Sequence, residues 1–84
     1  MEKDTTVIIE TSVGSKADAK NIADTLLALK LVACIHLIPH RSLYRWSDTV
    51  CDEEEWTISC TTLQVREDQV YEEIKMLQIG RAHV

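Results

Sequence analysis

Two soft metal ligands, Cys34 and His36, lie two positions apart in an apolar run with the pattern of a β-strand. Successive side chains of a strand point to opposite faces of a sheet, so these two share one face. Thiolate and imidazole groups bind soft and borderline ions such as copper. Two ligands are fewer than a metal site requires, and buried Cys and His side chains most often serve packing. The pair therefore predicts either ligands for copper or another divalent cation, completed by a second subunit, or a packing role.

A second set of same-face residues follows in the same segment, where Ser42, Tyr44 and Trp46 alternate with Leu43 and Arg45. Two aromatic rings beside arginines are more than a small core needs, and they indicate a docking surface. Such rings provide a large contact area together with a polar group. Two interpretations stay open: these residues line a ligand cleft between subunits, or they are buried in the packing between subunits.

The remaining polar residues carry simpler expectations. The acidic run Asp52–Glu55 offers oxygen ligands for hard cations, but strand alternation lets at most two carboxylates converge, so a solvated edge is predicted. His40, next to Arg41, is predicted to be a solvated residue at a bend. Cys51 and Cys60 have no adjacent base or cation and are not expected to be reactive.

The sequence shows no nucleophile with an adjacent base, no glycine-rich phosphate loop and no zinc spacing, so an enzyme is not expected.

The elements that position these residues follow from hydrophobic periodicity. Alternating β-branched and apolar residues predict strands, and apolar residues three and four apart, after Ser15 as an N-cap, predict a helix. The central extended segment is expected to break at Pro39, because proline in a strand indicates an edge, a bulge or a bend. The predicted elements are a strand over 6–11, a helix over 16–30, an extended segment over 33–46, a strand over 51–62 and a helix over 67–77.

This β-α-β-β-α order predicts an α+β fold in which both helices cover one face of an antiparallel sheet. It is a split β-α-β arrangement without its last strand. The absent strand would lie beside the first one. The edge formed by Val7, Ile8 and Ile9 is therefore expected to be unpaired and prone to aggregation.

Composition limits the classes of protein and partner. The chain has 84 residues, of which 45% are hydrophobic and 27% charged, so it forms one small domain for which association with other subunits is expected. Its net charge of −5 argues against a nucleic-acid partner. The first residues show no apolar signal region, and no run is long enough to cross a membrane. Three cysteines without a Cys-x-x-Cys pair favour free thiols in a reducing cytoplasm.

The last six residues, Ile79-Gly80-Arg81-Ala82-His83-Val84, have neither periodicity nor a turn pattern. They are the translation of ATC-GGA-AGA-GCA-CAC-GTC, part of a common sequencing-adapter string, and a preceding AG would complete the codon of Gln78. We therefore expect a single incomplete domain over residues 1–78 and interpret residues 79–84 as a non-native read-through tail.

The central segment carries a recognisable motif, Ala33-Cys34-Ile35-His36, Pro39, Ser42, Tyr44 and Trp46, followed by Glu55 and a hydrophobic strand. This motif resembles that of the CutA family of divalent-cation tolerance proteins, and the similarity extends from residue 6 to about residue 77. The resemblance implies a ferredoxin-like fold in tight homotrimers, with the long strand contributing to sheet pairing between subunits. It also singles out Glu55. The family continues after its second helix with a His-Pro-Tyr-Glu motif, a strand and a short helix, so this chain resembles a C-terminally truncated member.

Three positions depart from the family pattern. His36 stands where the family has Asn, and Thr11 stands where some relatives carry a Cys proposed as a copper ligand. Thr61 occupies the position of an expected Lys at the end of the third strand, which removes a positive charge from the expected cleft. The site that the His-Pro-Tyr-Glu motif would build is incomplete.

The residues and the resemblance together predict a cytoplasmic, trimeric protein for tolerance of or response to divalent metal ions such as copper. Cys34 and His36 are its candidate metal ligands. The alternative is a small-molecule-sensing regulatory module, which fold analogy alone supports. Its ligand cleft between subunits would contain Ser42, Tyr44, Trp46 and Glu55.

Overall fold

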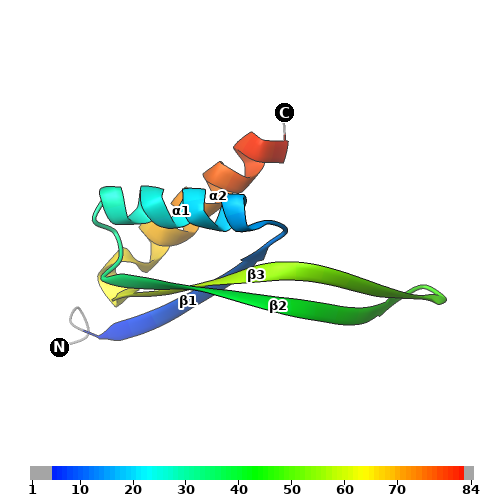
Figure 1. Cartoon of the computed structure of the whole chain (residues 1–84). Helices are drawn as coiled ribbons and strands as arrows, with labels where there is room; N and C mark the ends of the chain where they lie inside the picture. The colour runs from blue at the N-terminus through cyan, green and yellow to red at the C-terminus, as the bar shows by residue number, and fades with distance from the viewer. Residues whose placement is uncertain (1–4, 83–84) are drawn as a thin grey trace.

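The structure, a computed structural model, describes residues 5–82. The secondary-structure elements are, in chain order, β1 Thr6–Val13, α1 Lys16–Ala28, β2 Cys34–Trp46, β3 Thr49–Leu63, the 3-10 turn η2 Gln64–Arg66 and α2 Glu67–Ala82. The strands form one antiparallel sheet in the order β1-β3-β2, and both helices lie on the same face of it (Figure 1). The predicted α+β fold, a ferredoxin-like split β-α-β arrangement with β-α-β-β-α present, is confirmed.

Helix α1 begins and ends with local hydrogen bonds. At its start, the Ser15 Oγ accepts a bond of 3.1 Å from the Asp18 N–H, so the predicted N-cap is confirmed. At its end, the Lys30 N–H donates to the Leu27 carbonyl at 3.0 Å and the Leu31 N–H donates to the Leu26 carbonyl at 3.1 Å. This pair of bonds is the Schellman motif, and it places Lys30 in the left-handed region with φ 59°.

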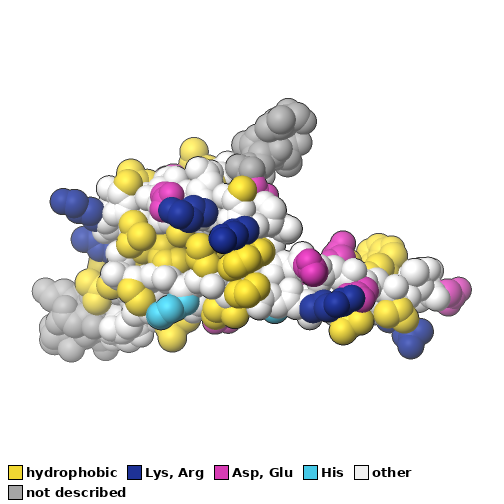
Figure 2. Space-filling view, viewed as in Figure 1, with side chains coloured by type: hydrophobic (Ala, Val, Ile, Leu, Met, Phe, Trp, Pro, Cys, Tyr) yellow, Lys and Arg dark blue, Asp and Glu magenta, His cyan; other side chains and the backbone are white. Residues whose placement is uncertain are grey.

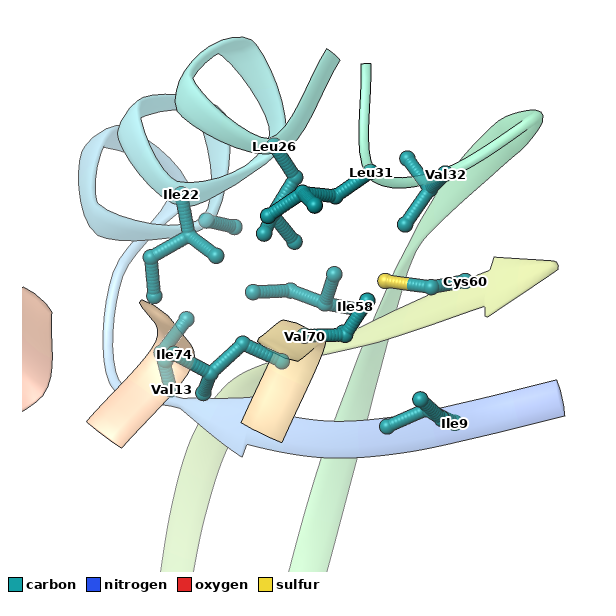
Figure 3. Packing of buried hydrophobic residues seen from close by; sticks show 11 residues of the cluster. Ile9, Val13, Ile22, Leu26, Leu31, Val32, Ile58, Cys60, Val70 and Ile74 are labelled. Atoms are coloured by element: carbon teal, nitrogen blue, oxygen red, sulfur yellow. The ribbon is translucent and has the colours of Figure 1, made fainter. Parts of the chain in front are cut away.

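The hydrophobic core lies between the sheet and the two helices (Figure 3). Strand alternation sends one face of β3 into it, and the i, i+3, i+4 spacing of each helix sends one stripe. Its most deeply buried members are Ile9 of β1, Ala19, Ile22 and Leu26 of α1, Ile58 and Cys60 of β3, and Val70 of α2. The prediction that Trp56, Ile58 and Cys60 share a face is confirmed, with Trp56 partly buried at the margin.

Strands β2 and β3 form a long hairpin that extends well beyond the helices (Figure 1). We call its outer part, residues 41–54, the hairpin arm; the molecule measures 48 × 29 × 20 Å. Pairing is continuous from Cys34 opposite Thr61 to Trp46 opposite Thr49. Leu43 and Trp46 on the arm are 66% and 72% exposed, so this chain by itself does not cover its apolar side chains.

The predicted break at Pro39 is wrong, whereas the sheet-edge position that a proline in a strand indicates is confirmed. β2 runs through this residue without interruption, and Pro39 pairs with Trp56 in register. β2 is an edge strand of the sheet, where a residue without an N–H donor is tolerated because one side of the strand makes no ladder bonds. The segment 34–46 therefore presents one uninterrupted set of alternating side chains.

Four element bounds differ from the predictions by two residues or more, and one predicted feature is confirmed. β1 extends to Val13, α1 ends at Ala28 rather than at residue 30, β3 begins at Thr49, and α2 runs on to Ala82 rather than ending at Leu77. The proposed junction at residue 78 thus lies inside a helix, and the read-through origin of residues 79–84 stays a prediction.

Within residues 5–82, β1 pairs only with β3, so the expected unpaired edge is present. None of the helices in this part of the chain is long and apolar enough to cross a membrane.

Candidate functional site

The candidate site residues gather on the face of the sheet opposite the helices, which we call the open face. Ile35 and Leu37 pack against the core, so the alternating neighbours Cys34 and His36 point away from it. Because β2 is continuous, Ser42, Tyr44 and Trp46 continue the same row. The structure therefore joins the two predicted sets of residues into one face of one strand.

Cys34 and His36 are both exposed on this open face. The Cys34 Sγ lies 3.9 Å from the Thr61 Oγ1, its partner across the sheet, and His36 faces Ser59. Packing inside the protomer therefore does not account for either side chain. Among residues 5–78, no group of three or more Cys, His, Asp or Glu side chains is arranged to hold a metal ion. One chain supplies a two-ligand set, whose thiol and imidazole chemistry suits copper or zinc.

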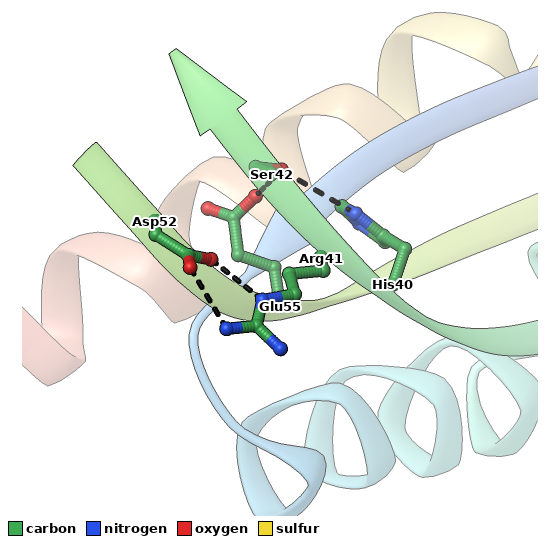
Figure 4. A network of polar contacts seen from close by, with 5 residues as sticks. All are labelled: His40, Arg41, Ser42, Asp52 and Glu55. Carbon is green, nitrogen blue, oxygen red and sulfur yellow. Dashed lines mark hydrogen bonds and ion pairs between the residues drawn. The ribbon is translucent and has the colours of Figure 1, made fainter. Parts of the chain in front are cut away.

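A polar network links both strands of the hairpin further along the open face (Figure 4). The Ser42 Oγ donates a hydrogen bond of 2.6 Å to the Glu55 Oε1, and the His40 Nδ1 lies 3.4 Å from the same Oγ. Because the serine proton is directed to the carboxylate, the Oγ acts as acceptor toward His40 and the imidazole proton belongs on Nδ1. The His40 Nε2 is shielded from solvent and has no hydrogen-bond partner in the described part of the chain.

This network corrects the prediction for His40, which is half-buried and not a solvated bend residue. The expectation failed because it depended on the break at Pro39. The usable signal was the two-residue spacing from His40 to Ser42, which places both on one face of an unbroken strand.

The two aromatic residues occupy separate positions. The Tyr44 Oη donates a hydrogen bond of 2.9 Å to the Glu53 Oε1. This bond, with a smaller contribution from the neighbouring Cys51, raises the pKa of Tyr44 to about 12. Trp46 lies at the end of the arm, opposite Thr49. The structure thus brings Ser42 and Glu55 into contact, pairs Tyr44 with a different glutamate, and leaves Trp46 apart.

The opposite face of the arm carries an ion pair. The Arg41 Nε and Nη2 donate to the two carboxylate oxygens of Asp52 at 2.7 and 2.8 Å (Figure 4). This guanidinium holds the pKa of the Asp52 carboxyl below its usual range. Asp52, Glu53 and Glu55 therefore each have a separate hydrogen-bond partner, and the solvated role expected for the acidic run stays a prediction.

The other two thiols differ from Cys34. Cys60 is buried in the core, and burial raises the pKa of its thiol to about 11. Cys51 is half-buried beside Tyr44. All three thiols are free. A thiol with a raised pKa is a poor nucleophile, which agrees with the expectation that Cys60 is unreactive.

The fold and the open face define a class: a small ferredoxin-like α+β protein with a long projecting hairpin and an exposed thiol–imidazole pair at the base of that hairpin. The family described as CutA1 divalent ion tolerance protein matches residues 7–79. The chain belongs to this family, and the resemblance found in its central motif is confirmed.

Individual relatives are similar at moderate identity. The divalent-cation tolerance protein CutA of Thermotoga maritima is 27% identical over 71 residues, covering 84% of this chain and 70% of the relative. The solved structure of the divalent cation tolerance protein Cut A1 from Thermus thermophilus is 27% identical with a TM-score of 0.77, covering 87% of this chain and 72% of that one. The structure of a protein described as the periplasmic divalent cation tolerance protein CutA from Archaeoglobus fulgidus is 26% identical with a TM-score of 0.79, covering 87% and 72%.

Proposed function

We propose that this protein binds copper or another divalent transition-metal ion and serves tolerance of such ions. The observation that carries the proposal is the exposure of Cys34 and His36 on the same face of β2, in a member of a divalent ion tolerance family. The two side chains fit a soft or borderline ion, because thiolate and imidazole are the ligands that copper and zinc prefer. When bound, the ion would take one ligand from each of these residues.

The remaining ligands come from a second copy in this proposal, since a metal site usually needs more than two protein ligands. The assembly we propose is a homotrimer joined through the hairpin arm. Two observations support it: a two-stranded hairpin is marginal in water by itself, and the arm exposes Leu43, Trp46 and Val50. Light scattering should give three times the protomer mass, and Trp46→Ala should shift the mass toward the monomer.

We further propose that the protein acts as a binding protein and not as an enzyme, and that it works in the cytoplasm. Three free thiols suit a reducing compartment. Fractionation of cells that produce the chain tests the location, and recovery with periplasmic marker proteins would contradict it.

Calorimetric titration with Cu²⁺ and Zn²⁺ tests the metal site. Cys34→Ala and His36→Ala should each weaken binding by at least about tenfold, because each removes one of few ligands. Cys51→Ala is the matched control, since it removes a thiol that also lies on the open face but is remote from Cys34 along the hairpin, and it should leave the affinity unchanged. Equal binding by all four proteins would refute the metal site.

The second candidate is a regulatory module that binds a small molecule between subunits. The hydrogen bond from Ser42 to Glu55 favours it, because this polar pair and the exposed ring of Tyr44 lie on the same open face. Titration with a panel of nucleotides separates the candidates. A nucleotide signal lost in Ser42→Ala, with no response to metal, would favour the regulatory module.

A further inference from the structure

A pocket of about 260 Å³ lies at the end of the body away from the hairpin arm. It is formed where the loop after α1, the start of β1, the end of β3 and η2 meet. Figure 2 shows basic side chains gathered at this end of the molecule, beyond α1. The lining residues are Thr6, Lys30, Leu31, Val32, Ala33, Thr61, Thr62, Leu63 and Arg66.

The charge of this pocket is opposite to that of the chain. The protein carries 14 acidic and 9 basic residues. Lys30 and Arg66 nevertheless both line the pocket, and no acidic side chain of the described residues does. Neither cation takes part in the ion pairs found in the described part of the chain, which join Lys20 to Asp24 and Arg41 to Asp52. The two positive groups therefore remain available to a ligand.

The backbone at Lys30 allows a precise test of this pocket. Its φ of 59° lies in the left-handed region at the position after a helix where glycine is favoured, because a Cβ is disfavoured there. The Schellman hydrogen bonds at the end of α1 hold the backbone of Lys30 in this conformation, so glycine is the substitution that fits this position best. Lys30 itself is one of the residues that line the pocket.

The rest of the lining suits an organic phosphate. Thr6 and Thr61 line the pocket. The Thr62 Oγ1 donates to the Leu31 carbonyl at 2.6 Å and so holds the loop against β3. Leu31, Val32 and Leu63 provide apolar surface. A guanidinium binds two phosphate oxygens at once, and an ammonium adds a point charge.

From these features we propose that the pocket bounded by Lys30 and Arg66 binds a small phosphate monoester, with the phosphate between the two cations and the organic group against Leu31, Val32 and Leu63. The site borders the open face at Thr61, whose Oγ1 lies 3.9 Å from the Cys34 Sγ, but neither proposed metal ligand lines it. Its volume limits the ligand to a small molecule.

Calorimetry with phenyl phosphate, inorganic phosphate and benzoate at low ionic strength tests the proposal. Phenyl phosphate should bind most tightly, because inorganic phosphate lacks the apolar group and benzoate carries a single charge. Arg66→Gln and Lys30→Gly should each weaken phenyl phosphate binding by about tenfold or more. Lys30→Gly should at the same time raise the melting temperature, since glycine relieves the left-handed backbone, so lost binding is not explained by lost folding.

Lys75→Gln, which removes one positive charge from the exposed surface of α2, is the control and should bind phenyl phosphate as the unchanged protein does. Equal weakening in Lys75→Gln and Lys30→Gly would overturn the proposal, because it would show general charge attraction. Benzoate binding as tightly as phenyl phosphate would also overturn it. Copper affinity should be unchanged in Lys30→Gly and Arg66→Gln, so the two proposed sites succeed or fail separately.

Discussion

Ser42 donates its short hydrogen bond to Glu55, although its partner in the strand register is Glu53. The bond is diagonal across the hairpin, and it leaves Glu53 free to accept from Tyr44. Two parallel polar links therefore join β2 to β3 on the open face of the arm. Diagonal pairs of this kind add to the stability of a two-stranded ribbon, which has few contacts besides its ladder bonds.

Removing the Ser42 hydroxyl tests the first of these links. Ser42→Ala should lower the free energy of unfolding by about 1 kcal/mol, because a half-buried hydrogen bond is lost and His40 Nδ1 loses its neighbour. Urea denaturation followed by tryptophan fluorescence measures the change. Ser59→Ala, on the same face of β3, is the matched control with an expected change below about 0.5 kcal/mol. Equal losses in both variants would contradict the role of the Ser42–Glu55 bond.

The second link predicts a dependence of stability on high pH. The bond to Glu53 raises the pKa of Tyr44 from 10.0 to about 12 in the folded protein. The stabilisation is therefore fully present below pH 10 and is lost as the pH rises through about 12. Ultraviolet absorbance should show Tyr44 ionising late, and Glu53→Gln should move that step toward pH 10. An unchanged titration in Glu53→Gln would show that the bond is not the cause.

The ion pair of Arg41 with Asp52 predicts the opposite dependence, at low pH. The guanidinium lowers the pKa of Asp52 below 3.8, so the stabilisation is present above about pH 4 and is lost as the pH falls through the lowered value. The pair is exposed, and the effect should be small and reduced by salt. NMR titration of the Asp52 carboxyl should show a higher pKa in Arg41→Met. Arg45→Met, which changes the next arginine on the same face, should leave that pKa unchanged.

Core packing gives a prediction that is independent of both proposed sites. Ile58 is completely buried, and Ile58→Val should lower the free energy of unfolding by about 1 kcal/mol through the loss of one methylene group. Ile8 lies on the open face and is 66% exposed, so Ile8→Val should change the free energy of unfolding by less than about 0.5 kcal/mol. Thermal melts of the two variants test the comparison. Similar decreases in melting temperature for both variants would contradict the assignment of Ile58 to the core.

Much of the fold could be predicted from the sequence because its signals are local. Ser15 caps α1 through a bond to a residue three positions away, and Ile22 and Leu26 share a helix face because of the helical repeat. The alternation of Ile58 and Cys60 likewise places both in the core whatever the partner strand. Family membership followed from the spacing of the central motif.

The candidate site depended on relationships between strands, which local patterns do not specify. Pro39 interrupts an isolated extended segment, yet it is accommodated here because β2 lies at the edge of the sheet. His40 joins Ser42 and Glu55 only once that strand is continuous and its register with β3 is set. The sequence by itself thus determined the order of helices and strands and, within each uninterrupted element, which side chains share a face. Only the tertiary structure decided which residues meet, because hydrogen-bond partners 13 positions apart depend on strand register, and the pocket of Lys30 and Arg66 depends on how four separate segments pack.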